Sequence, residues 1–181
     1  SDPDNILKSP SIPNPIDILF GSKTNYLANK IHRAVRRGRV AEPERLAYGW
    51  LLYLYSKWRI NPTKESYDLV PEFLKPIPEQ ITINHPPIFD MILWPVIRCN
   101  LLHKIGDRED RTFVGLEEIF DTFSCCAKIR WPWGKEIIEP SGQDGIFQVR
   151  TEFLDTFTKL EGWGLTSHFI STYGDLLDGF D

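Results

Sequence analysis

The sequence predicts a mainly α-helical protein, a compact single-domain bundle of about five to six helices. Three observations lead to this fold class. Apolar residues recur three and four positions apart in several segments, which is the spacing of one face of a helix. Hydrophobic residues make up 41% of the 181-residue chain, and 6 Trp and 11 Phe supply the bulk of a core. Proline, glycine and asparagine stand where these apolar segments begin and end, as they do at helix boundaries.

The N-terminal third contains an arm followed by two predicted helices. Residues 1–22 hold four prolines among serine and asparagine, so we expect an extended Pro-rich arm before a single helical domain over residues 23–181. Thr24 is a candidate N-cap for an amphipathic helix that Gly38 would end. Pro43 suits the first turn of a second helix, whose apolar run LAYGWLLYLYSKW predicts the buried centre of the domain.

Prolines divide the middle of the chain. Residues 61–80 contain four of them and are expected to cross the surface with one short helical turn at most. Residues 80–84 suit a short strand. From Pro86 the apolar residues follow one helical face, and Pro95 is expected to kink or split that helix.

The C-terminal part alternates between helical and irregular patterns. Residues 112–126 place apolar residues at helical spacing opposite acidic ones, which predicts a helix. The Trp/Pro/Gly-rich segment 128–145 predicts a loop or a small hairpin. Phe147 begins a pattern that we interpret as a helix ending near Gly162, and a last short helix is expected after Ser171 or the residue that follows it.

Charge, cysteine content and hydropathy limit the function classes. The net charge of −4 excludes a simple basic nucleic-acid binder, although residues 1–60 hold ten Lys and Arg against five Asp and Glu, and residues 61–181 hold eleven against twenty. Three cysteines without framework spacing argue against a disulfide-stapled secreted domain. The sequence has no long apolar run and no signal-peptide pattern, so we expect a protein of a reducing compartment, nuclear or cytoplasmic, without a membrane partner.

A set of polar residues stands at fixed places within the apolar, Pro-punctuated run His85–Lys104. The pattern reads His85-Pro86, Asp90, Pro95, Arg98 and Asn100, then Trp131–Gly142, then Trp163 and Ser171-Thr172. With this pattern the chain, from Asn25 to Asp178, resembles a fungal domain-of-unknown-function family that occurs C-terminal to the basic leucine zipper (bZIP) in fungal transcription factors. The resemblance implies a nuclear regulatory domain, and Cys99 stands where it implies an acidic residue.

His85 and Asp90 are candidates for proton transfer, because a carboxylate beside an imidazole fixes its tautomer and raises its basicity. No recognised nucleophile accompanies them, and a carboxylate near a helix start also serves as a cap, so we favour capping over catalysis. Arg98 would either grip a carboxylate or phosphate ligand or tie Asp90 or a Glu to a loop, and we favour the structural role. Asn100 completes this polar constellation.

Cys99 and His103 are four residues apart, a spacing that places two zinc ligands on one helix face. Cys125 and Cys126 are adjacent, form no C-x-x-C motif, and belong to a residue type that is usually buried. We therefore predict no metal and no other cofactor, and keep Cys99 and His103 as candidate ligands only.

One dense basic cluster lies on and just beyond the first predicted helix: His32, Arg33, Arg36, Arg37 and Arg39. Such a cluster contacts phosphates without reading sequence, or meets an acidic partner. The last 31 residues offer an acidic surface, with six Asp and Glu against one Lys, so head-to-tail self-association stays open. A solvated helix face is the simpler interpretation, and we favour it.

Trp94, Trp131 and Trp133 are candidate walls of a pocket for an apolar small molecule. The alternative is a satellite core that clamps loops over the helices.

The leading interpretation is a non-catalytic regulatory module of a fungal bZIP-type regulator. It would bind a protein partner or a small effector through the constellation of His85, Asp90, Arg98 and Asn100 and the three tryptophans, and would not recognise a DNA site by itself. Two alternatives stay open. One is an enzyme of fungal secondary metabolism that uses His85 and Asp90 for proton transfer in an aromatic-lined pocket. The other is phosphate or nucleic-acid contact through the Arg33–Arg39 cluster.

Overall fold

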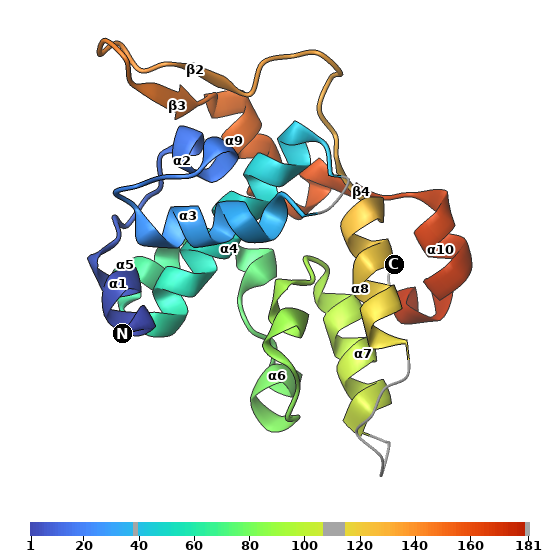
Figure 1. Ribbon diagram of the computed structural model, residues 1–181. Coiled ribbons are helices and arrows are strands. Elements are labelled where there is room, and N and C mark those ends of the chain that lie inside the picture. Colours follow the sequence, from blue (N-terminus) through green and yellow to red (C-terminus); the bar gives the residue numbers. More distant parts are fainter. Residues whose placement is uncertain (38–39, 107–114, 180–181) are drawn as a thin grey trace. The chain divides into compact units, whose positions relative to one another are not determined.

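A computed structural model describes residues 1–37, 40–106 and 115–179 of the chain. They form two compact units, each built from two stretches of sequence: Ser1–Pro71 with Ile129–Trp163, and Glu72–Lys128 with the segment from Gly164 onward. The predicted mainly α class is confirmed, because the described part of the chain holds ten α-helices against four strands of three residues each (Figure 1). The expected number of helices was too low. Six of the ten are only five to seven residues long, too short to show a helical period.

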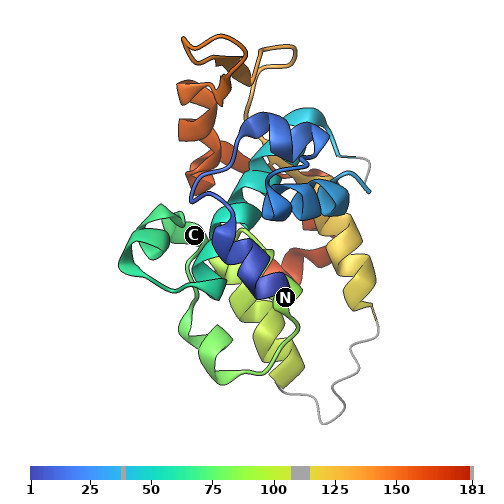
Figure 2. The ribbon, with the colours of Figure 1, turned by 60° about the vertical axis from the view of Figure 1, so that its left-hand side comes forward.

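The first unit has α4 at its centre, as the apolar run predicted. Its elements are α1 (Asp2–Lys8), α2 (Pro15–Phe20), α3 (Tyr26–Val35), α4 (Glu42–Ile60), α5 (Lys64–Leu69), β2 (Ile138–Pro140), β3 (Phe147–Val149), α9 (Thr151–Phe157) and the 3-10 helix η3 (Leu160–Gly162). Helices α2 and α3 pack against α4 (Figures 1 and 2). Gly49 of α4 permits this packing, because a Cβ there would lie 2.6 Å from Cγ2 of Ile18 in α2.

The N-terminal segment, expected to be an extended arm, contains α1 and α2 instead. Pro3 and Pro15 stand in the first turns of these helices, where the missing N–H costs nothing, so they start helices rather than prevent them. The Asn14 side chain caps α2. Ile6 is buried, and the ammonium of Lys57 in α4 donates to three carbonyl groups at the end of α1, at 2.6–3.0 Å. The segment is therefore packed on α4.

Helix α3 begins one residue later than predicted, because Asn25 and not Thr24 is its N-cap. The Asn25 side-chain oxygen accepts the backbone N–H of Ala28 at 3.1 Å. Gly38, expected to end this helix, lies outside the described residues.

The Trp/Pro/Gly segment 128–145, predicted as a loop or a small hairpin, contains only one strand of the observed hairpin, β2, and the partner strand β3 lies just beyond the segment. Strands β2 and β3 pair antiparallel, with Ile138 opposite Val149. The helix expected from Phe147 begins only with α9. Phe147 and Val149 are two residues apart, which is the period of a strand, and they belong to β3.

The second unit contains α6 and α7, which lie side by side (Figures 1 and 2). Its elements are the 3-10 helices η1 (Glu72–Leu74), η2 (Pro87–Met91) and η4 (Gly174–Leu177), and the helices α6 (Pro78–Thr82), α7 (Pro95–Gly106), α8 (Leu116–Cys126) and α10 (Ser167–Tyr173). Strands β1 (Ala127–Ile129) and β4 (Trp163–Leu165) pair with each other where the chain passes from one unit to the other.

Four expectations about the chain from residue 61 onward are corrected or refined by the structure. The segment 61–80 holds α5, η1 and the start of α6, so it has more helix than one turn. The strand expected at 80–84 is wrong, because Pro78 starts α6 there. Of the two outcomes expected at Pro95, the split is observed and the kink is not, because η2 is a separate 3-10 turn and α7 begins at Pro95. The last helix, α10, starts at Ser167, ahead of Ser171.

The predicted helix at 112–126 is observed as α8 from Leu116, and its expected first residues, 112–114, lie outside the described residues. Among the described helices, none combines the length and the apolar character that crossing a membrane requires.

Candidate functional site

Among the described residues of the second unit, Arg98 is the most deeply buried charged one, with no solvent exposure. Its guanidinium donates to the carbonyl oxygens of Ile92 at 2.5 Å, Phe73 at 2.9 Å and Lys75 at 3.1 Å. Its Nε donates to the side-chain oxygen of Gln80 at 3.0 Å. A buried charge is tolerated when its donors are satisfied in this way. These donors therefore point to the protein's own acceptors.

Gln80 in α6 links the cation of Arg98 to the anion of Asp90. While Oε1 accepts from Arg98 and from the backbone N–H of Ile77 at 3.0 Å, Nε2 donates to Oδ1 of Asp90 at 2.7 Å. The amide can satisfy all three bonds in only one orientation. Arg98 and Asp90, eight residues apart in sequence, are thus joined through an amide from a third element.

His85 and Asp90 are brought together, as the sequence predicted. Nε2 of His85 lies 2.8 Å from Oδ1 of Asp90, and their side chains are only 9% and 12% exposed. The other ring nitrogen, Nδ1, lies 2.7 Å from the carbonyl oxygen of Ile83. Each ring nitrogen of His85 therefore faces an acceptor of the protein itself. In this arrangement neither nitrogen offers a lone pair to a substrate.

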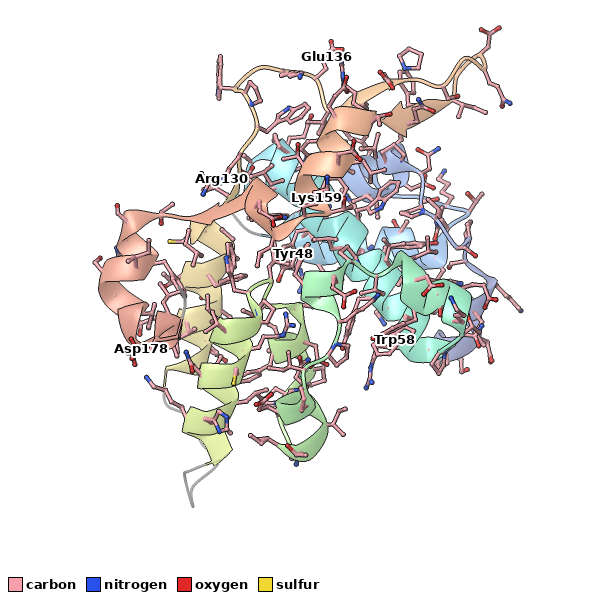
Figure 3. All side chains as sticks on the ribbon, turned by 180° about the vertical axis from the view of Figure 1, so that it is seen from behind. Tyr48, Trp58, Arg130, Glu136, Lys159 and Asp178 are labelled. Carbon is pink, nitrogen blue, oxygen red and sulfur yellow. The ribbon has the colours of Figure 1, made fainter. Side chains whose placement is uncertain are left out.

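Asn100 and Trp94 flank the network without joining it. The Asn100 amide donates to the carbonyl oxygens of Leu176 at 2.9 Å and Asp178 at 3.0 Å, so it holds η4 beside α7 (Figure 3, where Asp178 is labelled). Trp94 is buried, with its ring edge against Phe123 of α8 at 5.8 Å between centroids. Both residues act in packing in this structure.

Trp131 and Trp133 belong to the first unit, on the loop that leads from β1 to β2 and also carries Glu136 (Figure 3). Trp131 packs edge-on against Phe153 of α9 at 4.9 Å, and its Nε1 donates to the carbonyl oxygen of Lys135 at 3.1 Å. The ammonium of Lys135 lies 4.6 Å from the centre of the Trp131 ring. Trp133, in contrast, has a relative exposure of 101%, which means that no other residue covers it.

A tight turn places Trp133 at the tip of this loop. The N–H of Lys135 donates to the carbonyl oxygen of Pro132 at 3.2 Å, and Gly134 has φ +77°, the conformation that the third position of such a turn requires. Because Trp131 and Lys135 fix the base of the turn, Trp133 projects from an ordered support.

The basic cluster on α3 is largely exposed. Arg33, Arg36 and Arg37 face solvent, whereas His32 is half-buried, with Nδ1 3.1 Å from the carbonyl oxygen of Ile18. Arg39, also predicted to belong to this cluster, lies outside the described residues.

The two candidate metal ligands, Cys99 and His103, share one face of α7 and are joined there by Glu79 of α6. Their ligand atoms all lie within 4.8 Å of one another. The pKa of the Cys99 thiol is raised by burial and by the neighbouring Glu79 carboxylate, which also accepts a hydrogen bond from the thiol. Cys125 is exposed and Cys126 is buried, and neither belongs to this group.

Sequence reasoning missed Gln80 and Glu79. One local signal marks them, since Pro78 occupies the first position of a helix and Gln80 follows Ile77 by three, the spacing of a capping glutamine. That signal predicts α6 but not its contacts with α7.

The fold and the site define a mainly α-helical protein whose second unit holds a buried hydrogen-bond network that joins His85, Asp90, Gln80 and Arg98. The model of one protein family, described as "Domain of unknown function (DUF3425)", matches residues 53–181, which is more than half of the chain. The chain belongs to this family. No curated protein and no solved structure matches it.

Proposed function

We propose that this chain is a non-catalytic interaction module of a transcription regulator and binds a protein partner through Trp133. The resemblance to domains that follow a basic leucine zipper supports the regulatory and nuclear part of the proposal. The exposure of Trp133 is the observation that supports binding of a protein partner.

A fully exposed tryptophan on an ordered turn has the properties of a binding hot spot. Tryptophan is enriched among residues that dominate binding energy, because a large ring is desolvated at the cost of few torsions. The turn from Pro132 to Lys135 holds the side chain out before binding, which lowers the ordering cost. The chemistry that fits Trp133 is an apolar pocket on a partner protein.

The geometry of His85 supports a non-catalytic role. A general base needs a free lone pair within reach of its substrate, and both ring nitrogens of His85 face acceptors of the protein itself. Arg98, likewise, binds carbonyl groups of its own unit.

A reporter assay tests the regulatory role. The chain is fused to a heterologous DNA-binding domain in a fungal host, and expression from a reporter with the matching site is compared with that of the DNA-binding domain alone. We expect a change in expression that Trp133→Ala removes. Phe20→Ala, which truncates another exposed aromatic residue, is the matched control and should leave the change intact. Unchanged expression with the intact chain would count against a regulatory role.

A second experiment tests direct binding. A photoreactive phenylalanine at the exposed position 136, on the same loop as Trp133, captures the partner, which is then purified and titrated with the chain. We expect a defined stoichiometry and a Kd that Trp133→Ala weakens by about thirtyfold or more, the effect of losing a hot-spot tryptophan. Equal affinity of the Trp133→Ala and Phe20→Ala variants would refute the assignment of Trp133.

A further inference from the structure

We propose that Glu79, Cys99 and His103 form a binding site for a divalent transition metal ion, with Zn²⁺ as the best match. The site lies within the second unit, between α6 and α7, and its argument is independent of the proposed function. Its three ligand atoms, a carboxylate oxygen, a thiol sulfur and an imidazole nitrogen, lie within 4.8 Å of one another.

The ligand set selects the class of ion. Thiolate and imidazole ligands favour Zn²⁺ and its neighbours over Mg²⁺ and Ca²⁺, which take oxygen ligands. With the thiol and the carboxyl group both deprotonated, two negative charges offset the charge of the ion, so the bound site is neutral. Binding releases the thiol proton to solvent as the metal replaces it between Cys99 and Glu79.

The helices place these side chains in the required way. Cys99 and His103 are one helical turn apart on α7, and Glu79 reaches them from α6, with Oε1 3.9 Å from Nε2 of His103. In a tetrahedral zinc site, bonds of about 2.0–2.3 Å hold ligand atoms about 3.3–3.6 Å apart. The ligand atoms therefore need to close by about an ångström, which rotation of the exposed His103 side chain can provide.

Three protein ligands leave one coordination position for water or for a ligand from a partner. Glu79 and Cys99 are half-buried and His103 is exposed, so the metal can enter from solvent. The site is of the open type found where a metal exchanges or binds a further group, not of the closed four-ligand structural type.

Metal titration of the whole chain tests the proposal. The protein is reduced, stripped with a chelator, and titrated with Zn²⁺ by calorimetry and with Co²⁺ by absorption spectroscopy. We expect one strong equivalent and, with Co²⁺, a charge-transfer band from a thiolate ligand. Cys99→Ser, His103→Ala and Glu79→Gln should each weaken binding by about tenfold or more, and Cys99→Ser should remove the band.

Two matched variants act as controls within the same unit. Cys125→Ser and His168→Ala remove an exposed thiol and an exposed imidazole and should leave the affinity unchanged. Because His103 is exposed, we expect His103→Ala to keep the fold. Its metal affinity therefore tests the proposal even if Cys99→Ser disturbs the packing. The proposal is overturned by absence of binding, by a cobalt complex without the thiolate band, or by binding that responds equally to the control and ligand variants.

Discussion

Replacing Arg98 by methionine should destabilise the protein strongly, because the guanidinium satisfies four acceptors from inside the second unit. Methionine fills a similar length but donates no hydrogen bond. Each buried acceptor left without a partner costs about 1–3 kcal/mol, although partial rehydration reduces the sum. In Arg98→Met, the Asp90 carboxylate keeps its hydrogen bonds with His85 and Gln80, so it is not left without a partner.

The expected loss is therefore about 3–5 kcal/mol in the free energy of unfolding, the range seen when one member of a buried charged group is removed. For a chain of this size it corresponds to a fall in Tm of roughly 6–20 °C. Urea unfolding followed by far-UV circular dichroism measures the free energy. Arg98→Lys keeps the charge but loses the planar guanidinium, so its free energy of unfolding should lie between those of Arg98→Met and the wild type.

Arg33→Met is the matched control, since Arg33 is exposed on α3 and its replacement should change stability by about 0.5 kcal/mol or less. If Arg98 were held ready for a ligand instead, its removal would relieve a buried charge and raise the stability of the free protein. A loss below about 1 kcal/mol for Arg98→Met, or a gain, would refute the structural argument.

Three further substitutions test other parts of the structure. Lys57→Met removes the ammonium that binds three carbonyl groups at the end of α1, so we expect a loss of about 1–3 kcal/mol and faster amide exchange confined to α1; unchanged exchange would contradict the cap. Gly162→Ala places a Cβ 1.8 Å from a backbone carbonyl oxygen of α9 and should lower stability by about 2 kcal/mol or more, whereas Gly174→Ala, in open space, should be neutral in the same thermal melt. Burial and the Glu79 carboxylate raise the pKa of Cys99, so less thiolate is present at pH 8. In metal-free protein, Glu79→Gln lowers that pKa and should speed alkylation of Cys99, while the exposed thiol of Cys125 reacts as before. Equal rates of Cys99 alkylation in the wild type and in Glu79→Gln would contradict this cause.

The long helices could be predicted from sequence, whereas the short helices α1, α2 and α6 could not. Helix α4 has 19 residues, enough turns for its apolar pattern to repeat and for Pro43 to mark its start. Helix α1 has seven residues and one buried side chain, Ile6, so its pattern carries no period. Pro3 suggests a helix breaker from sequence, because proline ends one helix and starts another, and only the neighbouring caps and the packing decide between the two.

The candidate site divides in the same way. His85 and Asp90 are five residues apart, so their pairing follows from local chain geometry. Gln80 is 18 residues from Arg98, and an uncharged amide gives no sign of the partner that it will meet. The contact depends on how α6 packs against α7, which no local pattern specifies. For Trp133 the sequence leaves the burial undecided, because a tryptophan beside proline and glycine occurs both in buried loops and at exposed turns. Only the packing of the whole loop shows that this side chain is exposed.

The packing of α6 on α7 also explains why two different polar groups occur side by side. Neighbouring residues on a helix point about 100° apart. Glu79 and Gln80 therefore diverge from α6, and Arg98 and Cys99 diverge from α7, so that Gln80 meets Arg98 while Glu79 meets Cys99. One register between the helices sets both contacts, and a shift of one residue would break both at once. A change that moves α6 should disturb the buried network and the proposed metal site together, whereas His103→Ala removes a metal ligand and leaves every bond of Arg98 in place.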